Sequence, residues 1–237
     1  MPSPSEVAAF SALMAKIAGM ASEKAADVVA AAPDRAVLRD AYPDIIDPYL
    51  QASAQVTEEW YHSMAPDSGY AVEAAPPISR DALRANAGWA VTQLDAVGAL
   101  TGSAERQVYN ASRQTVVHNA QREGVTYARE ARATACGFCK MLATRGPVYA
   151  SKSAASGVAG KRGTPRGKAK LGGKYHDNCH CVAVPVRVGD SYQPPDYAKD
   201  WEQEYINARN EVGGNPDDIA NRMRPSQAGK AVVLDAQ

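Results

Sequence analysis

Four cysteines lie within residues 136–181, in two groups on either side of a segment rich in glycine and lysine. The first group is the Cys136-Gly-Phe-Cys139 turn, and the second contains His176, Cys179 and Cys181. A Cys-x-x-Cys turn offers two thiolates to a tetrahedral zinc ion, whose other ligands are usually cysteine or histidine. The pattern therefore predicts a structural zinc site in which Cys136 and Cys139 form one pair.

The second group offers more ligands than a closed zinc site needs. His176 is the best third ligand, while Cys179 and Cys181 compete for the fourth position. If residues 179–185 form a strand, Cys179 and Cys181 point to the same face and His180 points away, because side chains alternate along a strand. This geometry disfavours His180 as a ligand and leaves the choice between the two cysteines open.

Two other interpretations of the cysteines remain. They could form two disulfides in an oxidising compartment, or Cys136 and Cys139 could form a redox motif of the thioredoxin type. A polar helix rather than a buried strand precedes the motif, which disfavours the redox interpretation. The first acidic residue after Cys136 is Asp177, so the sequence lends little support to a hydrolytic zinc site.

The segment 145–174 between the two groups is uniformly basic, and it contains no Asp or Glu. Its basic residues are Arg145, Lys152, Lys161, Arg162, Arg166, Lys168, Lys170 and Lys174. With seven glycines and few apolar residues, the segment cannot bury enough surface to order itself, so we expect a mobile loop. Such a loop could contact the phosphate backbone of double-stranded DNA without sequence preference, contact an acidic partner surface, or simply be solvated.

Helices must position these groups, because apolar residues recur at intervals of three and four through much of the chain. Ser3 and Glu6 form a capping box for a first helix that ends near Ala32. Pro43 and Pro48 predict a break or kink in the second helix. We expect a loop at 65–78, a third helix from Ser79 to about 97, a turn at Gly98 and Gly102, and a fourth helix at about 103–133.

No strand-like alternation precedes residue 140, so residues 1–133 are interpreted as an extended helical region. A small zinc-knuckle module with short β-strands follows at 134–187. Residues 188–237 form a C-terminal helical tail, with helices expected at 196–212 and 217–223. The predicted fold class is mainly α.

Overall charge and hydropathy exclude two classes of protein. The 26 basic and 26 acidic residues balance, which argues against a polybasic protein of the histone type. No run of about 18 apolar residues exists, so we expect no membrane partner.

The order of these motifs resembles the Mu F-like minor head proteins of tailed bacteriophages. Helices are followed by Cys-x-x-Cys, a variable loop, and His-x-x-Cys-x-Cys before a Val-x-Val-Pro strand, here at 131–139 and 176–185. The sequence departs from the family where Asp177 replaces a frequent proline and His180 replaces a frequent arginine. The resemblance covers about residues 100–187.

The resemblance implies a structural minor capsid protein of a phage head, present in few copies near the portal vertex. It implies association with the portal protein, and with a major capsid or scaffolding protein. It also implies assembly in the host cytoplasm, a final place inside the virion head, and assistance in DNA packaging or delivery. The alternative is a capsid maturation protease, for which no catalytic set is evident, since Ser112 and His118 lie on different faces of one predicted helix.

Overall fold

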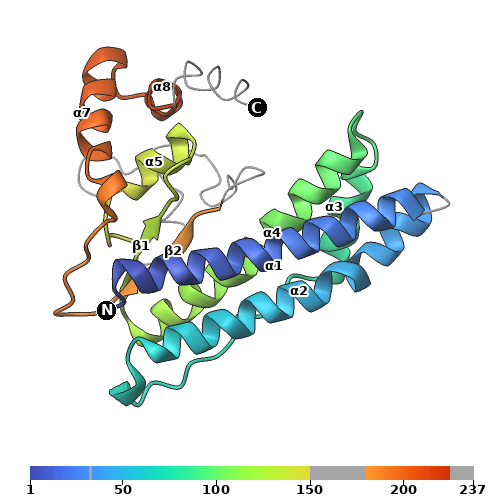
Figure 1. Ribbon diagram of the computed structural model, residues 1–237, viewed down its shortest axis with the longest axis horizontal. Coiled ribbons are helices and arrows are strands. Elements are labelled where there is room, and N and C mark those ends of the chain that lie inside the picture. Colours follow the sequence, from blue (N-terminus) through green and yellow to red (C-terminus); the bar gives the residue numbers. More distant parts are fainter. Residues whose placement is uncertain (32–33, 150–179, 225–237) are drawn as a thin grey trace, which may run out of the picture.

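A computed structural model of the chain describes residues 1–31, 34–149 and 180–224. It is mainly helical, with one two-stranded sheet among the described residues, which confirms the predicted fold class. Long helices form a bundle, and a smaller group of short elements packs at one end of it (Figure 1). No helix in these three ranges is long and apolar enough to cross a membrane.

Helices α1 (Pro4–Ala31) and α2 (Arg35–Ser63) run antiparallel along the bundle (Figure 1). The capping box at the start of α1 is confirmed, because the Ser3 amide donates to Glu6 Oε2 at 2.7 Å and the Glu6 amide donates to Ser3 Oγ at 3.3 Å. Of the predicted break or kink in the second helix, the break is wrong, since α2 continues through Pro43 and Pro48. The face of α2 that includes Leu38, Tyr42, Ile46 and Leu50 is buried in the core, and this packing outweighs the two lost amide donors.

Helix α3 (Arg80–Ala90) begins at Ser79, whose hydroxyl accepts the Ala82 amide at 3.2 Å, as predicted. Two expectations beyond it are wrong. The helix ends at Ala90, and Gly98 and Gly102 lie inside α4 (Ala96–Glu123) rather than in a turn. The reason is Asp95, whose carboxylate accepts the Gly98 amide at 2.8 Å and thereby caps the start of α4.

The predicted fourth helix is ten residues too long at its C-terminal end, because α4 stops at Glu123 instead of near residue 133. Gly124 adopts a left-handed conformation with φ of 77°, a backbone state that ends helices and that glycine adopts without strain. Strand β1 (Thr126–Glu130) follows, which corrects the expectation that no strand precedes residue 140. It pairs antiparallel with β2 (Val182–Val186), with Thr126 opposite Val186 and Glu130 opposite Val182.

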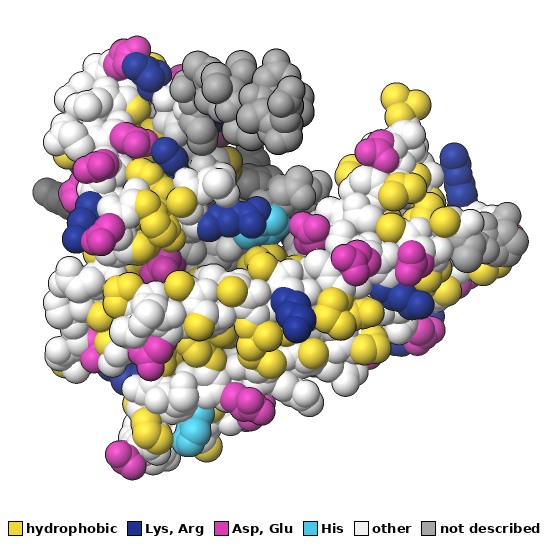
Figure 2. All heavy atoms as spheres, viewed as in Figure 1, with side chains coloured by type: hydrophobic (Ala, Val, Ile, Leu, Met, Phe, Trp, Pro, Cys, Tyr) yellow, Lys and Arg dark blue, Asp and Glu magenta, His cyan; other side chains and the backbone are white. Residues whose placement is uncertain are grey.

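The described part of the smaller group also contains three short helices: α5 (Gly137–Ala143), α7 (Trp201–Val212) and α8 (Pro216–Arg222). Asn215 caps α8 as predicted, since its side chain accepts the Asp217 amide at 3.0 Å. The Trp201 side chain is buried beneath this group, so the tail docks on its own chain. Hydrophobic side chains also remain on the visible face of the long helices (Figure 2). Leu13 and Met20 of α1 are among the exposed large hydrophobic residues.

Candidate functional site

The Cys-x-x-Cys motif forms the start of α5. Cys136 is the N-cap residue, and its carbonyl accepts the Lys140 amide at 3.0 Å. The first turn of the helix then turns Cys139 inward, where it is buried, while Cys136 stays half-buried. The two sulfur-bearing side chains therefore come from one tight turn, as a metal-binding knuckle requires.

Gly137, the second residue of the motif, is fixed by a close backbone approach. A Cβ atom placed on Gly137 would lie 1.9 Å from the Ala220 carbonyl oxygen and 2.9 Å from the Arg224 amide nitrogen. These backbone atoms belong to α8 and the residues just after it, so no side chain can move aside. The glycine thus lets the C-terminal helix pack directly against the cysteine turn.

Cys181 reaches the same place from the other end of the basic segment. It lies directly before β2 and packs in one buried cluster with Cys139 and Trp201, with Cys136 at its edge; we call this set the cysteine cluster. The pairing of β1 with β2 brings the two groups together, because residues 126–130 stand opposite residues 182–186, shortly before the Cys136 turn and directly after Cys181.

Two buried arginines contact the Cys181 sulfur. Arg129 Nη2 lies 3.0 Å from Sγ, and Arg113 Nη1 lies 3.6 Å from it while also donating to the Cys181 carbonyl at 3.1 Å. Arg113 and Arg129 are 2 % and 3 % exposed. Two cationic donors in a buried site favour the thiolate over the thiol, and a thiolate is both the metal ligand and the nucleophilic form of cysteine.

His180, two residues before β2, lies against α4. Its Nε2 lies 3.1 Å from Glu105 Oε2, and its ring stacks on Tyr109 with centroids 4.9 Å apart. Its Nδ1 is buried and has no hydrogen-bond partner within the described ranges. Burial raises the pKa of Tyr109 to about 12, so the phenol stays neutral beside the histidine.

A buried acid lies on the same sheet. Glu130, the last residue of β1, is only 8 % exposed, and its one hydrogen bond comes from the Tyr192 hydroxyl at 3.4 Å. Burial raises the pKa of Glu130 to about 7 from its ordinary value of 4.5. Glu130 is therefore a group whose charge changes near neutral pH.

The structure brings three of the five predicted metal ligands into one cluster. The other two, His176 and Cys179, lie outside the described residues. Within the ranges that are described, no three His, Cys, Asp or Glu side chains are close enough to hold a metal ion. Sulfur donors and nearby cationic hydrogen-bond donors suit zinc in their chemistry, but the described cysteines alone do not complete a site.

Of the predicted basic contacts, Arg145 is described and half-buried just after α5. The remaining seven, Lys152, Lys161, Arg162, Arg166, Lys168, Lys170 and Lys174, lie outside the described residues. Sequence reasoning did not identify Arg113 and Arg129 as site residues, because it expected one continuous helix over about 103–133. The contact between Arg129 and Cys181 can be expected only once β1 is recognised as a strand, because the two residues then fall on one face of the sheet.

The two residues considered for proteolysis have separate surroundings. Ser112 is buried in the bundle, where its hydroxyl accepts a hydrogen bond from Thr57 at 2.9 Å. His118 Nε2 lies 2.7 Å from Glu73 Oε1 near the surface, and Arg122 contacts the same carboxylate oxygen at 2.9 Å. Hydrogen bonding to His118 lowers the pKa of Glu73 below its usual range, so this carboxylate stays ionised.

Comparison with known protein families gives a match over most of the chain. Residues 1–208 match the protein family described as VG15 protein. No curated protein and no solved structure matches the chain. Because the family match spans well over half of the 237 residues, the chain belongs to the VG15 protein family, and this membership indicates a phage or viral protein.

Proposed function

We propose that this protein is a structural, non-enzymatic component of a tailed-phage head that associates with the portal protein at the portal vertex. It assembles in the host cytoplasm, remains inside the head, and assists procapsid assembly and DNA packaging or delivery. Membership of a viral family supports this proposal, as does the resemblance of residues 100–187 to Mu F-like minor head proteins.

The observation that carries the proposal is the cysteine cluster, whose members flank the basic segment in the sequence. Cys139 and Cys181 come from the two sides of segment 150–179 and share one buried cluster, as the resemblance implies. A zinc ion held by Cys136, Cys139, His176 and either Cys179 or Cys181 would join the two groups of ligands. Bound zinc holds its cysteine ligands as thiolates and contributes folding energy to a small module.

Arg113 and Arg129 support the same assignment. Their contacts with the Cys181 sulfur, at 3.6 and 3.0 Å, place positive charge where a thiolate needs it. Hydrogen bonds from surrounding residues to a ligand commonly orient it and tune its metal affinity. We therefore favour Cys181 over Cys179 as the fourth ligand.

The charge of the basic segment indicates what kind of partner the module would bind. Eight basic residues without an acidic one between 145 and 174 match either a DNA backbone or an acidic surface of the portal, capsid or scaffolding protein. If the partner is DNA, the affinity of the chain for double-stranded DNA should fall steeply as the salt concentration rises. A pull-down with double-stranded DNA across a salt series, repeated with the portal protein as bait, separates the two.

Metal analysis tests the site directly. The purified full chain should contain about one zinc per molecule, and Cys139→Ser should lose it. Val108→Ala, a core change in the long-helix bundle, is the matched control because it lowers stability without removing a sulfur. Metal-free wild-type protein, or equal zinc in the Cys139 variant, would contradict the zinc assignment.

The alternative function is a capsid maturation protease. The observation in its favour is the contact between His118 and Glu73, because a carboxylate beside a histidine can orient a catalytic base. Co-expression with the major capsid protein should leave that protein intact under our proposal. Cleavage that disappears in a His118→Ala variant would instead establish the protease.

A further inference from the structure

The short helix α5 lies between two sets of contacts. Cys136, Cys139 and Ala143 recur at intervals of three and four, and all three pack in or against the cysteine cluster. Met141 and Leu142 lie on the other side of the helix, are only 2 % exposed and belong to a separate buried cluster. The C-terminal part of the chain completes that second cluster with Ala208, Ile219 and Met223. Helix α5 thus presents its cysteines on one side and an apolar docking surface on the other.

Helices α7 and α8, which we call the tail helices, depend on α5 for their place. They pack mainly against α5 and against each other rather than against the long helices of the bundle. The backbone of α8 reaches the cysteine turn itself, because Gly137 has no Cβ atom to meet the Ala220 carbonyl oxygen. Lys140, which directly follows the cysteine motif, links α5 to α7, since its Nζ lies 3.1 Å from Glu204 Oε2 and 5.4 Å from the centre of the Trp201 ring. The tail helices therefore dock on the same helix that carries the Cys-x-x-Cys motif.

Helix α5 is too short to be stable by itself. It has only seven residues, whereas isolated helices shorter than about 12–15 residues are marginal in water. Its neighbours must therefore stabilise it. The tail helices do so on one side, and a metal ion held by Cys136 and Cys139 would do so on the other, because it would fix the two ends of the first turn.

We propose that zinc binding and docking of the tail helices are coupled through α5, so that each strengthens the other. This inference rests on the zinc site of the proposed function. The coupling is reciprocal, because two events that stabilise the same conformation of α5 must favour each other by the same factor. The tail helices are then a control element of the zinc site, and a partner that pulls them away from α5 weakens the hold of the protein on its metal.

Two measurements on the full chain test the coupling. Ile219→Ala removes apolar contacts from the docking surface and leaves every proposed zinc ligand in place. In a competition titration with a chelator, its zinc affinity should fall about 5- to 150-fold, the usual range for coupling between two sites. In the reciprocal measurement, a chelator removes zinc from the wild-type chain. Amide hydrogen exchange should then become faster in α7 and α8, and far more so than in α2.

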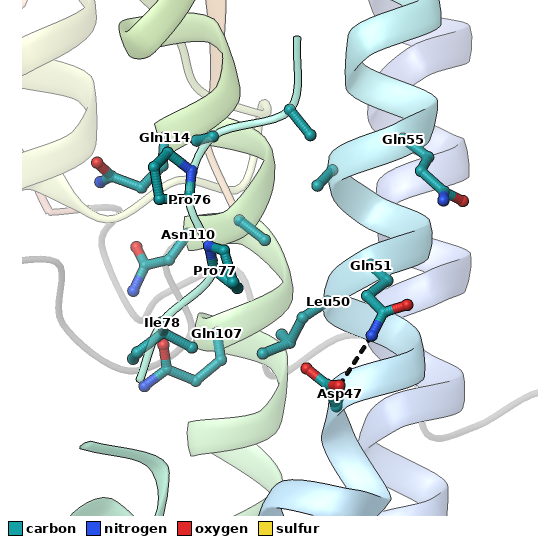
Figure 3. A pocket seen from close by; sticks show the side chains of 14 residues that line it. Asp47, Leu50, Gln51, Gln55, Pro76, Pro77, Ile78, Gln107, Asn110 and Gln114 are labelled. Atoms are coloured by element: carbon teal, nitrogen blue, oxygen red, sulfur yellow. Dashed lines mark hydrogen bonds between the residues drawn. The ribbon is translucent and has the colours of Figure 1, made fainter. Parts of the chain in front are cut away.

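The long-helix bundle provides a matched control. A cavity of about 540 Å³ lies between α2, α4 and residues 74–78, and Leu50 of α2 lines it (Figure 3). Among the described residues that line this cavity, none belongs to α5, α7 or α8. Leu50→Ala therefore removes buried apolar atoms outside the tail interface, so it should lower the stability of the chain and leave its zinc affinity unchanged.

The outcomes separate this inference from the function on which it rests. Equal zinc affinity in the wild-type and Ile219→Ala chains, or exchange in α7 and α8 that does not respond to zinc removal, would overturn the coupling and leave the zinc site standing. Equal losses of affinity in Ile219→Ala and Leu50→Ala would also overturn it, because affinity would then follow overall stability. Wild-type protein without zinc would instead overturn the zinc site, and the coupling with it. The exchange measurement needs no variant, so it decides the question even if Ile219→Ala does not fold.

Discussion

The buried acid Glu130 gives the protein a pH-dependent stability that one substitution should remove. Its pKa is about 7 in the folded chain, against an ordinary value of 4.5, and its side chain is too buried for water to screen it. That difference corresponds to about 3 kcal/mol, since each tenfold change in proton affinity is worth about 1.4 kcal/mol.

The direction of this pH dependence follows from which state of the protein, folded or unfolded, loses the Glu130 proton at the lower pH. Below pH 4.5 the Glu130 carboxyl is protonated in both the folded and the unfolded chain, so its ionisation does not change the free energy of unfolding. Between pH 4.5 and 7 the unfolded chain ionises while the folded chain does not, so the free energy of unfolding falls as pH rises. Above pH 7 the full cost of about 3 kcal/mol remains, because the folded protein then carries a buried charge.

Glu130→Gln stays neutral at every pH, so it should be as stable as the wild type at pH 4.5 and about 3 kcal/mol more stable at pH 8.5. Urea unfolding followed by tryptophan fluorescence measures both values. Glu59→Gln, at an exposed position of α2, is the control and should show no such pH dependence. A stability difference that is the same at both pH values would refute the reasoning.

Three further predictions concern packing and charge. Gly137→Ala should lower the free energy of unfolding by about 1–3 kcal/mol, because the added methyl group would meet backbone atoms of α8. Amide hydrogen exchange in α8 should become faster, and unchanged exchange there would contradict this prediction. Glu123→Gln should cost roughly 3–5 kcal/mol in urea unfolding, since it breaks the part-buried pair in which Arg187 Nε lies 2.7 Å from Glu123 Oε1. Glu211→Gln, in an exposed pair, should cost less than about 1 kcal/mol, and equal losses would show that burial is not the cause. Arg129→Met should weaken zinc binding about 10–100-fold in a competition titration with a chelator; unchanged affinity would remove its role at the sulfur.

Local signals predicted much of the helical half. Ser3 with Glu6, and Ser79, mark helix starts through bonds that span three residues, so the sequence alone contains them. The stripe of Val7, Phe10 and Met14 is buried as its spacing indicates. These features depend on neighbours within one or two turns and need no knowledge of the fold.

The predictions from sequence fail where contacts between distant parts of the chain determine the structure. Strand β1 exists because β2, more than fifty residues later, pairs with it. Its own sequence, Thr-Tyr-Ala-Arg-Glu, has no apolar alternation, since Arg129 and Glu130 are buried on opposite faces by other elements. The cavity between α2, α4 and residues 74–78 was likewise unpredicted, because it forms only where two helices and an extended segment meet.

The central claim is that this chain is a structural part of a phage head, and the particles themselves test it most directly. Quantitative mass spectrometry of purified virions of the encoding phage should find this chain in a small number of copies per particle. It should also remain with the portal when heads are disrupted. Its absence from purified virions, despite expression during infection, would contradict the account.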